Sequence, residues 1–281
     1  MEETPIAPED EGPSISMLRE ELGFHKDDNT ADIDECLEVA EITPKQRRQV
    51  SVLTKQDAFQ RWLKEEAGSA ALVAYGNLEI DDYISPLSYL SARIGKQYYG
   101  KRGYIVLSYA CGLHSRSAGY GWSEAVATMI GQLLLQAGNL LDLKGIMSRH
   151  DFKGFKKRNL HTLTTVFASL IGQLRSSRVV LFCLIDSISF YEATERERET
   201  KEVLSTLRRL VESMRPGKRD TRKGKMVFKL LISEALTSEI AHKYVKRDEV
   251  VEMSEDAEEA SGDDLQDGSE SLEEVSAEDE A

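Results

Sequence analysis

Asp186 is the residue of this sequence whose type and position most readily suggest chemistry. It follows five apolar or cysteine residues, Leu181 to Ile185, so its carboxylate should stand at the carboxyl end of a buried strand. A carboxylate in that place can coordinate a cation. An aspartate at a strand end also commonly caps the loop or helix that follows, and the sequence alone leaves both interpretations open.

A basic segment between Arg215 and Lys225 is the second candidate, with six basic residues and one acid. Clusters of this kind can bind phosphate backbones. However, the segment lies between a predicted helix and a predicted strand, and it has no aromatic residue on which a base could stack. We therefore interpret it as a solvated loop and do not expect nucleic acid as a partner. Its basic residues are Arg215, Lys218, Arg219, Arg222, Lys223 and Lys225.

The remaining reactive side chains form no pattern that indicates catalysis. There is no G-x-S-x-G motif, and neither His114 nor His161 has an acid and a nucleophile nearby in the sequence. The three cysteines form no C-x-x-C pair. Their odd, sparse number favours a reducing compartment.

An alternation of apolar runs and amphipathic helices must position these residues. Continuous apolar runs are typical of strands buried on both faces. Their alternation with helices predicts an α/β fold with a mainly parallel sheet between two helical layers. The expected strands span residues 70–75, 104–111, 179–185, 227–232 and 249–253, and the expected helices span residues 55–67, 86–98, 122–137, 160–174 and 194–214.

The charge distribution divides the chain into three parts. Residues 1–40 hold 13 acidic and 2 basic side chains, and residues 252–281 hold 14 acidic and no basic ones. The stretch between them has 22 acidic and 34 basic residues. Since acidic low-complexity segments cannot bury a core, we expect a largely disordered acidic arm at 1–50, a folded domain at 55–252 and a disordered acidic tail at 253–281. Within the arm, the scattered apolar residues of 15–50 could support a short helix or two.

Several short pieces, in their order and spacing, carry a family resemblance. The clearest is the run from Leu181 to Glu192, LFCLIDSISFYE. Together the pieces resemble the fungal branch of the NACHT (STAND-type) signalling NTPases, with a nephrocystin-like N-terminal P-loop domain, over roughly residues 55–252. The other pieces are Trp62-Leu63, Gly76-Asn77, Ser85 to Ser88, Cys111-Gly112, Gly131 to Leu134 and Phe228 to Ser233.

The resemblance implies a phosphate-binding loop, but the matching stretch lacks the residues that would bind a nucleotide. A working loop reads G-x-x-x-x-G-K-[ST]. Here only Gly76 remains, while Asp81, Asp82 and Tyr83 occupy the positions of the second glycine, the lysine and the hydroxyl. A carboxylate about 4 Å from a phosphate charge is repelled by roughly 4 kcal/mol at an effective dielectric constant near 20. What the resemblance leaves is a vestigial nucleotide site at Gly76, Asn77 and Asp186.

From these residues we expect a non-catalytic pseudo-NTPase that acts as a regulatory or protein-interaction module, with a protein partner and no cofactor. One alternative is a residual ATP- or GTP-binding NTPase domain that uses Mg-ATP, for which Asp186 is the direct support. Another is a polyanion-binding protein that uses the basic middle of the chain. The N-terminus shows no secretory signal and no run of about 18 apolar residues exists, so we expect an intracellular, cytoplasmic protein without a membrane span.

Overall fold

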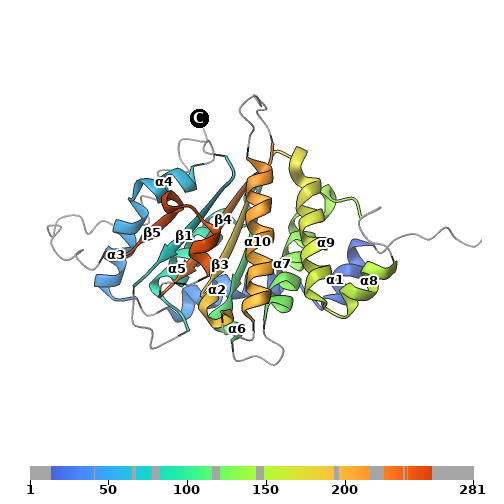
Figure 1. Cartoon of the computed structure of the whole chain (residues 1–281), viewed down its shortest axis with the longest axis horizontal. Helices are drawn as coiled ribbons and strands as arrows, with labels where there is room; N and C mark the ends of the chain where they lie inside the picture. The colour runs from blue at the N-terminus through green and yellow to red at the C-terminus, as the bar shows by residue number, and fades with distance from the viewer. Residues whose placement is uncertain are drawn as a thin grey trace, which may run out of the picture.

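A five-stranded parallel sheet forms the centre of the protein, as a computed structural model shows (Figure 1). The strands lie in the order β2-β3-β4-β1-β5, and every neighbouring pair is parallel. The strands are β1 (Ala70–Tyr75), β2 (Tyr104–Ala110), β3 (Val180–Asp186), β4 (Val227–Glu234) and β5 (Val250–Glu252). The structure describes residues 14–40, 42–64, 68–77, 83–115, 121–143, 149–192, 196–215, 225–236, 238 and 240–254.

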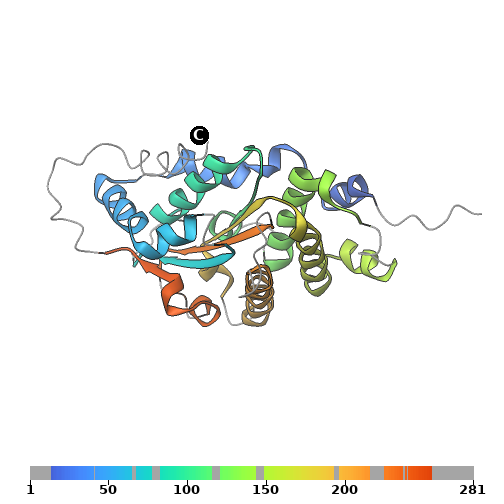
Figure 2. The same ribbon diagram turned by 90° about the horizontal axis from the view of Figure 1, so that it is seen from above.

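Helices cover both faces of the sheet, which confirms the predicted α/β class (Figure 2). Helices α1, α7, α9 and α10 pack on one face, and α2, α3, α4 and α5 pack on the other. The helices are α1 (Ile15–Glu21), α2 (Ala31–Val39), α3 (Pro44–Thr54), α4 (Asp57–Leu63), α5 (Pro86–Tyr98), α6 (Cys111–His114), α7 (Trp122–Ala137), α8 (Arg149–Lys156), α9 (Leu160–Gln173) and α10 (Glu197–Met214). Short 3-10 turns are η1 (Asp27–Asn29), η3 (Gly138–Leu140), η4 (Leu174–Ser176), η5 (Ile188–Tyr191), η6 (Ala241–Tyr244) and η7 (Arg247–Glu249).

Two buried cores explain why the strands are apolar along their whole length. Successive side chains of a strand point to opposite faces, so Leu181 and Cys183 belong to the core under α7 and α10, while Phe182 and Leu184 belong to the core under α5. Every residue of β3 is buried. This central position is what a continuous apolar run predicts, and it fixes Asp186 as the last residue of a strand.

The N-terminal region departs from the expectation of a largely disordered arm at 1–50. Within it, helices α1, α2 and part of α3 pack against the domain, with Leu18, Ile33 and Cys36 buried. The reason is close packing: a Cβ on Gly131 of α7 would overlap the ring of Phe24, so the missing side chain makes room for that ring. The acidic residues of this region lie between apolar positions that face the core. Residues 1–13 lie outside the described part of the chain.

Glutamine side chains close the outer edge of β2, where backbone groups would otherwise lack partners. Gln132 and Gln136 stand one turn apart on α7. Gln132 accepts from Ser108 N and donates to Ser108 O, both at 2.9 Å. Gln136 pairs in the same way with Val106, at 2.9 and 2.7 Å. Since an open edge invites pairing with another chain, α7 substitutes for a sixth strand at this side of the sheet.

Candidate functional site

The carboxyl ends of β1, β3 and β4 lie side by side along the C-terminal edge of the sheet and bring the candidate residues together. Asp186 is paired in register with Ser233, and Tyr75 is paired with Glu234. Asn77, two residues after β1, and Ser187, directly after β3, adopt positive φ angles of 49° and 57°. Such a conformation is uncommon outside glycine and turns the chain sharply. Ligands of parallel α/β sheets bind at this kind of edge.

Three serine hydroxyls hold Asp186 at the centre of this edge. Its Oδ2 accepts from Ser88 at 2.7 Å and from Ser187 at 2.8 Å, and its Oδ1 accepts from Ser233 at 2.6 Å. The residue is only 4% exposed. Burial raises the pKa of Asp186, while the bonds from the three serines oppose that rise. The carboxylate therefore ties β3 to β4 and to α5.

Ser88 reaches Asp186 because a capping box fixes the start of α5. The hydroxyl of Ser85 accepts from the backbone N–H of Ser88 at 3.1 Å, and the Ser88 hydroxyl accepts from the Ser85 N–H at 2.9 Å. Pro86 occupies the first helical position, as the sequence predicted. The pair of a serine hydroxyl and a carboxylate is a donor set that suits Mg²⁺. Here the pair is buried and Asp186 also accepts from two further serines, so an Mg²⁺ ion would have to displace these hydroxyl donors from the carboxylate.

Glu234, next to Ser233, is a second buried acid that sequence reasoning missed. It is 0% exposed, and its Oε1 accepts from the backbone N–H of Ser189 at 2.7 Å. Among the described residues, its Oε2 has no hydrogen-bond partner, and neither has the hydroxyl of Tyr75, which is also buried. Burial is the main cause that raises the pKa of Glu234 well above its ordinary value, and the charge of Asp186 adds to it. The edge of the sheet therefore holds two acids in a dry environment.

The N-terminal region contributes a third acid, Asp32 of α2. Its Oδ2 accepts from the backbone N–H of Ala110 at 2.8 Å, and its Oδ1 lies 2.8 Å from Nε2 of His114. Burial alone would lower the pKa of His114, but the hydrogen bond and charge of Asp32 outweigh it, so the pKa is raised. The His114 ring also stacks on Tyr109, with 4.6 Å between ring centres. His114 is thus an anchor for α2.

The stretch from Gly76 to Tyr83, which we expect to be a vestigial phosphate-binding loop, is only partly within the described chain. The N–H of Gly76 donates to the carbonyl of Glu234 at 2.8 Å, so it continues the sheet, and Asn77 is exposed. Residues 78–82, which include the acids that we expect to repel phosphate, lie outside the described residues.

The basic segment is divided in the same way. Arg215 serves the fold, because its guanidinium pairs with Glu249 and donates to the carbonyl of Ser69. Lys225 precedes β4 and is half-buried. The four basic residues between them, Lys218, Arg219, Arg222 and Lys223, lie outside the described part of the chain.

Comparison with known proteins gives no family for this chain. Neither the protein-family models nor the curated proteins contain a match to its sequence. Among the described residues, none of the helices has the length and apolar character that crossing a membrane requires. The three cysteines are buried free thiols.

Proposed function

We propose that this protein is a non-catalytic relative of the NACHT-type signalling NTPases that acts through protein contacts, as an intracellular regulatory or interaction module. The observation that carries the proposal is the Ser88–Asp186 hydrogen bond, together with the residue that precedes Ser88. In a working P-loop a lysine stands immediately before the serine or threonine, and it reaches the terminal phosphates. Here that residue is Leu87, which is fully buried.

The absence of the lysine does not depend on how the loop is aligned. If Tyr83 takes the hydroxyl position, the residue before it is Asp82, and if Ser88 takes it, the residue is Leu87. No lysine or arginine occurs between Lys64 and Arg93. A triphosphate placed at this edge would meet buried acids without a cation from the loop to balance it. This supports a domain that keeps the shape of a nucleotide site without its affinity.

The arrangement of the strands supports the relationship to P-loop domains. β1 leads into the vestigial loop and β3 ends in Asp186, and β4 lies between them. All three strands are parallel, so the loop and the acid share one edge of the sheet. Ser88, at the start of the helix that follows the loop, meets the acid across this edge. These are the positions that a phosphate-binding loop, its hydroxyl and its acid occupy in a P-loop enzyme.

The second candidate function is a residual ATP- or GTP-binding domain, which the same Ser88–Asp186 pair favours. Thermal unfolding of the full chain, with and without millimolar Mg-ATP or Mg-GTP, separates the two. A ligand at a hundredfold excess over its Kd stabilises the native state by about 2.7 kcal/mol, which is easily detected. We expect no change in Tm with either nucleotide.

A rise in Tm that disappears in Asp186→Asn would contradict the proposal and favour the residual nucleotide site. A rise that persists in Asp186→Asn also contradicts it, because a nucleotide would then bind away from this edge. The same measurement with EDTA in place of Mg²⁺ is the control, because a site that needs the metal then no longer binds the nucleotide, although the protein is unchanged.

A further inference from the structure

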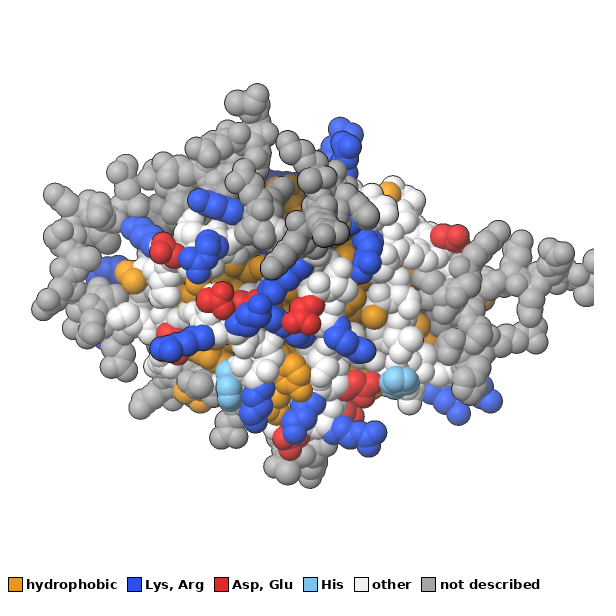
Figure 3. Space-filling view, turned by 45° about the horizontal axis from the view of Figure 1, so that its top comes forward, with side chains coloured by type: hydrophobic (Ala, Val, Ile, Leu, Met, Phe, Trp, Pro, Cys, Tyr) orange, Lys and Arg blue, Asp and Glu red, His pale blue; other side chains and the backbone are white. Residues whose placement is uncertain are grey.

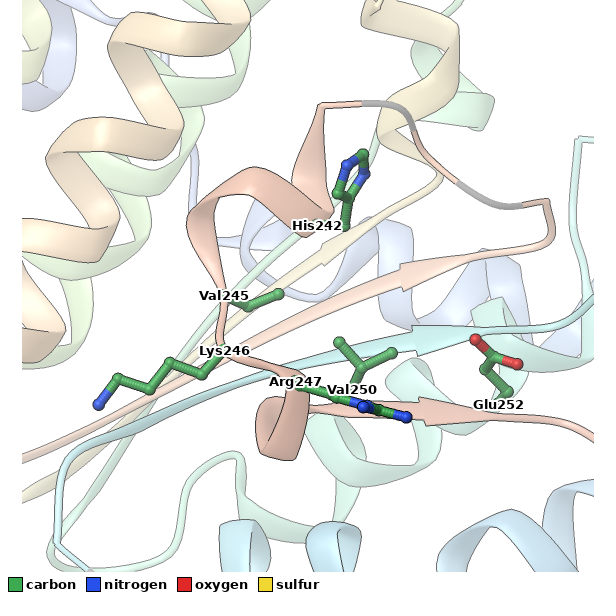
Figure 4. Close-up of a pocket in the computed structure, with 6 residues that line it drawn as sticks. All are labelled: His242, Val245, Lys246, Arg247, Val250 and Glu252. Carbon is green, nitrogen blue, oxygen red and sulfur yellow. The ribbon is translucent and has the colours of Figure 1, made fainter.

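A surface pocket, whose lining does not include Asp186 or Ser88, lies between the η6–η7 turn and the edge strand β5 (Figure 4). Its volume is about 430 Å³. Val245 and Val250 form its apolar part, and Figure 4 shows Glu252 at the far end of the strand. The other three lining residues carry nitrogen side chains and are exposed: His242, Lys246 and Arg247.

Two acids lie next to these residues: Glu252, which lines the pocket, and Glu249 of η7, which is already paired with other residues. Glu249 of η7 is bound by Arg208 at 2.6 Å and also pairs with Arg215. Burial alone would raise the pKa of Glu249, but its hydrogen bonds to the Lys246 N–H and to the two arginines lower it overall. The carboxylate therefore stays charged and paired at neutral pH. Its negative charge is balanced by Arg208 and Arg215 and does not offset the charges of Lys246 and Arg247.

Within the described chain, neither Lys246 nor Arg247 forms an ion pair. Asp248 and Glu252 are the acids beside them, and Lys243 adds a further exposed cation. Figure 3 views the side of the molecule that carries α10, and Lys and Arg side chains gather over it with fewer Asp and Glu between them. Three exposed cations, Lys243, Lys246 and Arg247, therefore stand against two exposed acids, Asp248 and Glu252, and this small positive excess beside Val245 and Val250 suits an anionic chain with some apolar side chains.

We propose that the acidic tail of this same chain, residues 255–281, binds back into this pocket. The tail holds 13 acidic residues and no lysine or arginine, and it also offers Leu265, Leu272 and Val275 to the apolar part. It begins three residues after Glu252, which lines the pocket. A short tether of this kind raises the local concentration of the tail to about millimolar, so weak contacts suffice. The bound tail covers the cationic residues and excludes other acidic ligands from them.

Binding of a labelled peptide with the sequence of residues 255–281 tests this proposal by fluorescence anisotropy. The peptide is titrated with the full chain and with a chain that ends at Ser254, which keeps every described helix and strand. We expect the shortened chain to bind at least fivefold more tightly at low salt, because the full chain's own tail competes. Affinity should fall steeply with added salt, since exposed charges are screened beyond about 10 Å at 0.1 M.

Charge reversal locates the site. In the shortened chain, Lys246→Glu with Arg247→Glu should weaken peptide binding at least tenfold. The matched control is Lys26→Glu with Arg102→Glu, two exposed cations on the β2 side of the sheet, which should change the affinity less than twofold. Equal affinity of the full and shortened chains would overturn the proposal, as would equal weakening by both double variants. Circular dichroism of each variant verifies folding, and the test is independent of whether nucleotide binds at Asp186.

Discussion

Replacing Asp186 should destabilise the protein by an amount that follows from its three hydrogen bonds. In Asp186→Ala, the Ser88 hydroxyl keeps a partner, because it lies 3.2 Å from the Ser85 hydroxyl. The hydroxyls of Ser187 and Ser233 donate only to Asp186 among the described contacts. A buried polar group left unsatisfied costs about 1–3 kcal/mol. Two such groups give an expected loss of about 2–6 kcal/mol in the free energy of unfolding.

Asp186→Asn should cost much less. Its amide has the shape of the carboxylate, its oxygen still accepts, and its NH₂ group can donate to a serine hydroxyl that rotates. We expect a loss of about 1 kcal/mol, in line with one weakened hydrogen bond. The comparison separates the hydrogen-bonding role of Asp186 from its charge.

Urea unfolding at neutral pH, followed by circular dichroism, measures these differences as changes in midpoint at constant m. The triple variant Asp186→Ala, Ser187→Ala, Ser233→Ala is the matched control. Removing both partners of a buried hydrogen bond is nearly neutral, so the triple variant should be more stable than Asp186→Ala alone. If Asp186→Ala is as stable as the wild type, or the triple variant is less stable than the single one, our reasoning about Asp186 is wrong.

Three further changes test other parts of the structure. Gln132→Leu leaves the N–H and C=O of Ser108 without their side-chain partner and should cost about 2–5 kcal/mol in urea unfolding; no loss would show that water can close this edge equally well. Gly131→Ala forces the Phe24 ring aside and should cost about 1–3 kcal/mol, and combining it with Phe24→Ala should give less than the sum of the two single losses, whereas strict additivity would contradict the contact. The pKa of Glu234 is raised in the folded state, so protonated Glu234 contributes its full stabilisation below its ordinary pKa near 4.5, and this stabilisation is lost as the pH rises toward the folded-state pKa. Glu234→Gln should therefore flatten the fall in unfolding free energy over this pH range. If the fall is unchanged in the variant, another group causes it.

Local patterns were enough to determine most of the scaffold. The run Ala70–Tyr75 and the helix Trp122–Ala137 have the predicted bounds, and α5 begins at Pro86 as predicted. These features depend on neighbours in the sequence: apolar continuity for a buried strand, and a cap followed by proline for a helix start. The position of Asp186 at the end of β3 follows from the same kind of information.

The N-terminal region shows where local patterns were insufficient. Its acidic composition predicted disorder, yet Ile33 and Phe24 are buried against glycines of α5 and α7 that lie far away in the sequence. A partner that distant cannot be read from composition. The local signal for these helices was the set of apolar residues scattered between the acids, which indicates a short helix or two but does not identify what the helices pack against.

The sequence by itself therefore determined the fold class, the order of most elements and the absence of a lysine or arginine between Lys64 and Arg93, because each depends on residue types along the chain. Only the tertiary structure decided what Asp186 does, since its partners Ser88 and Ser233 come from two other elements. The same holds for the burial of Glu234 and the anchoring of Asp32 on His114. Hydrogen bonding and desolvation depend on distances in space, and these are fixed when separate strands and helices converge on one edge of a sheet.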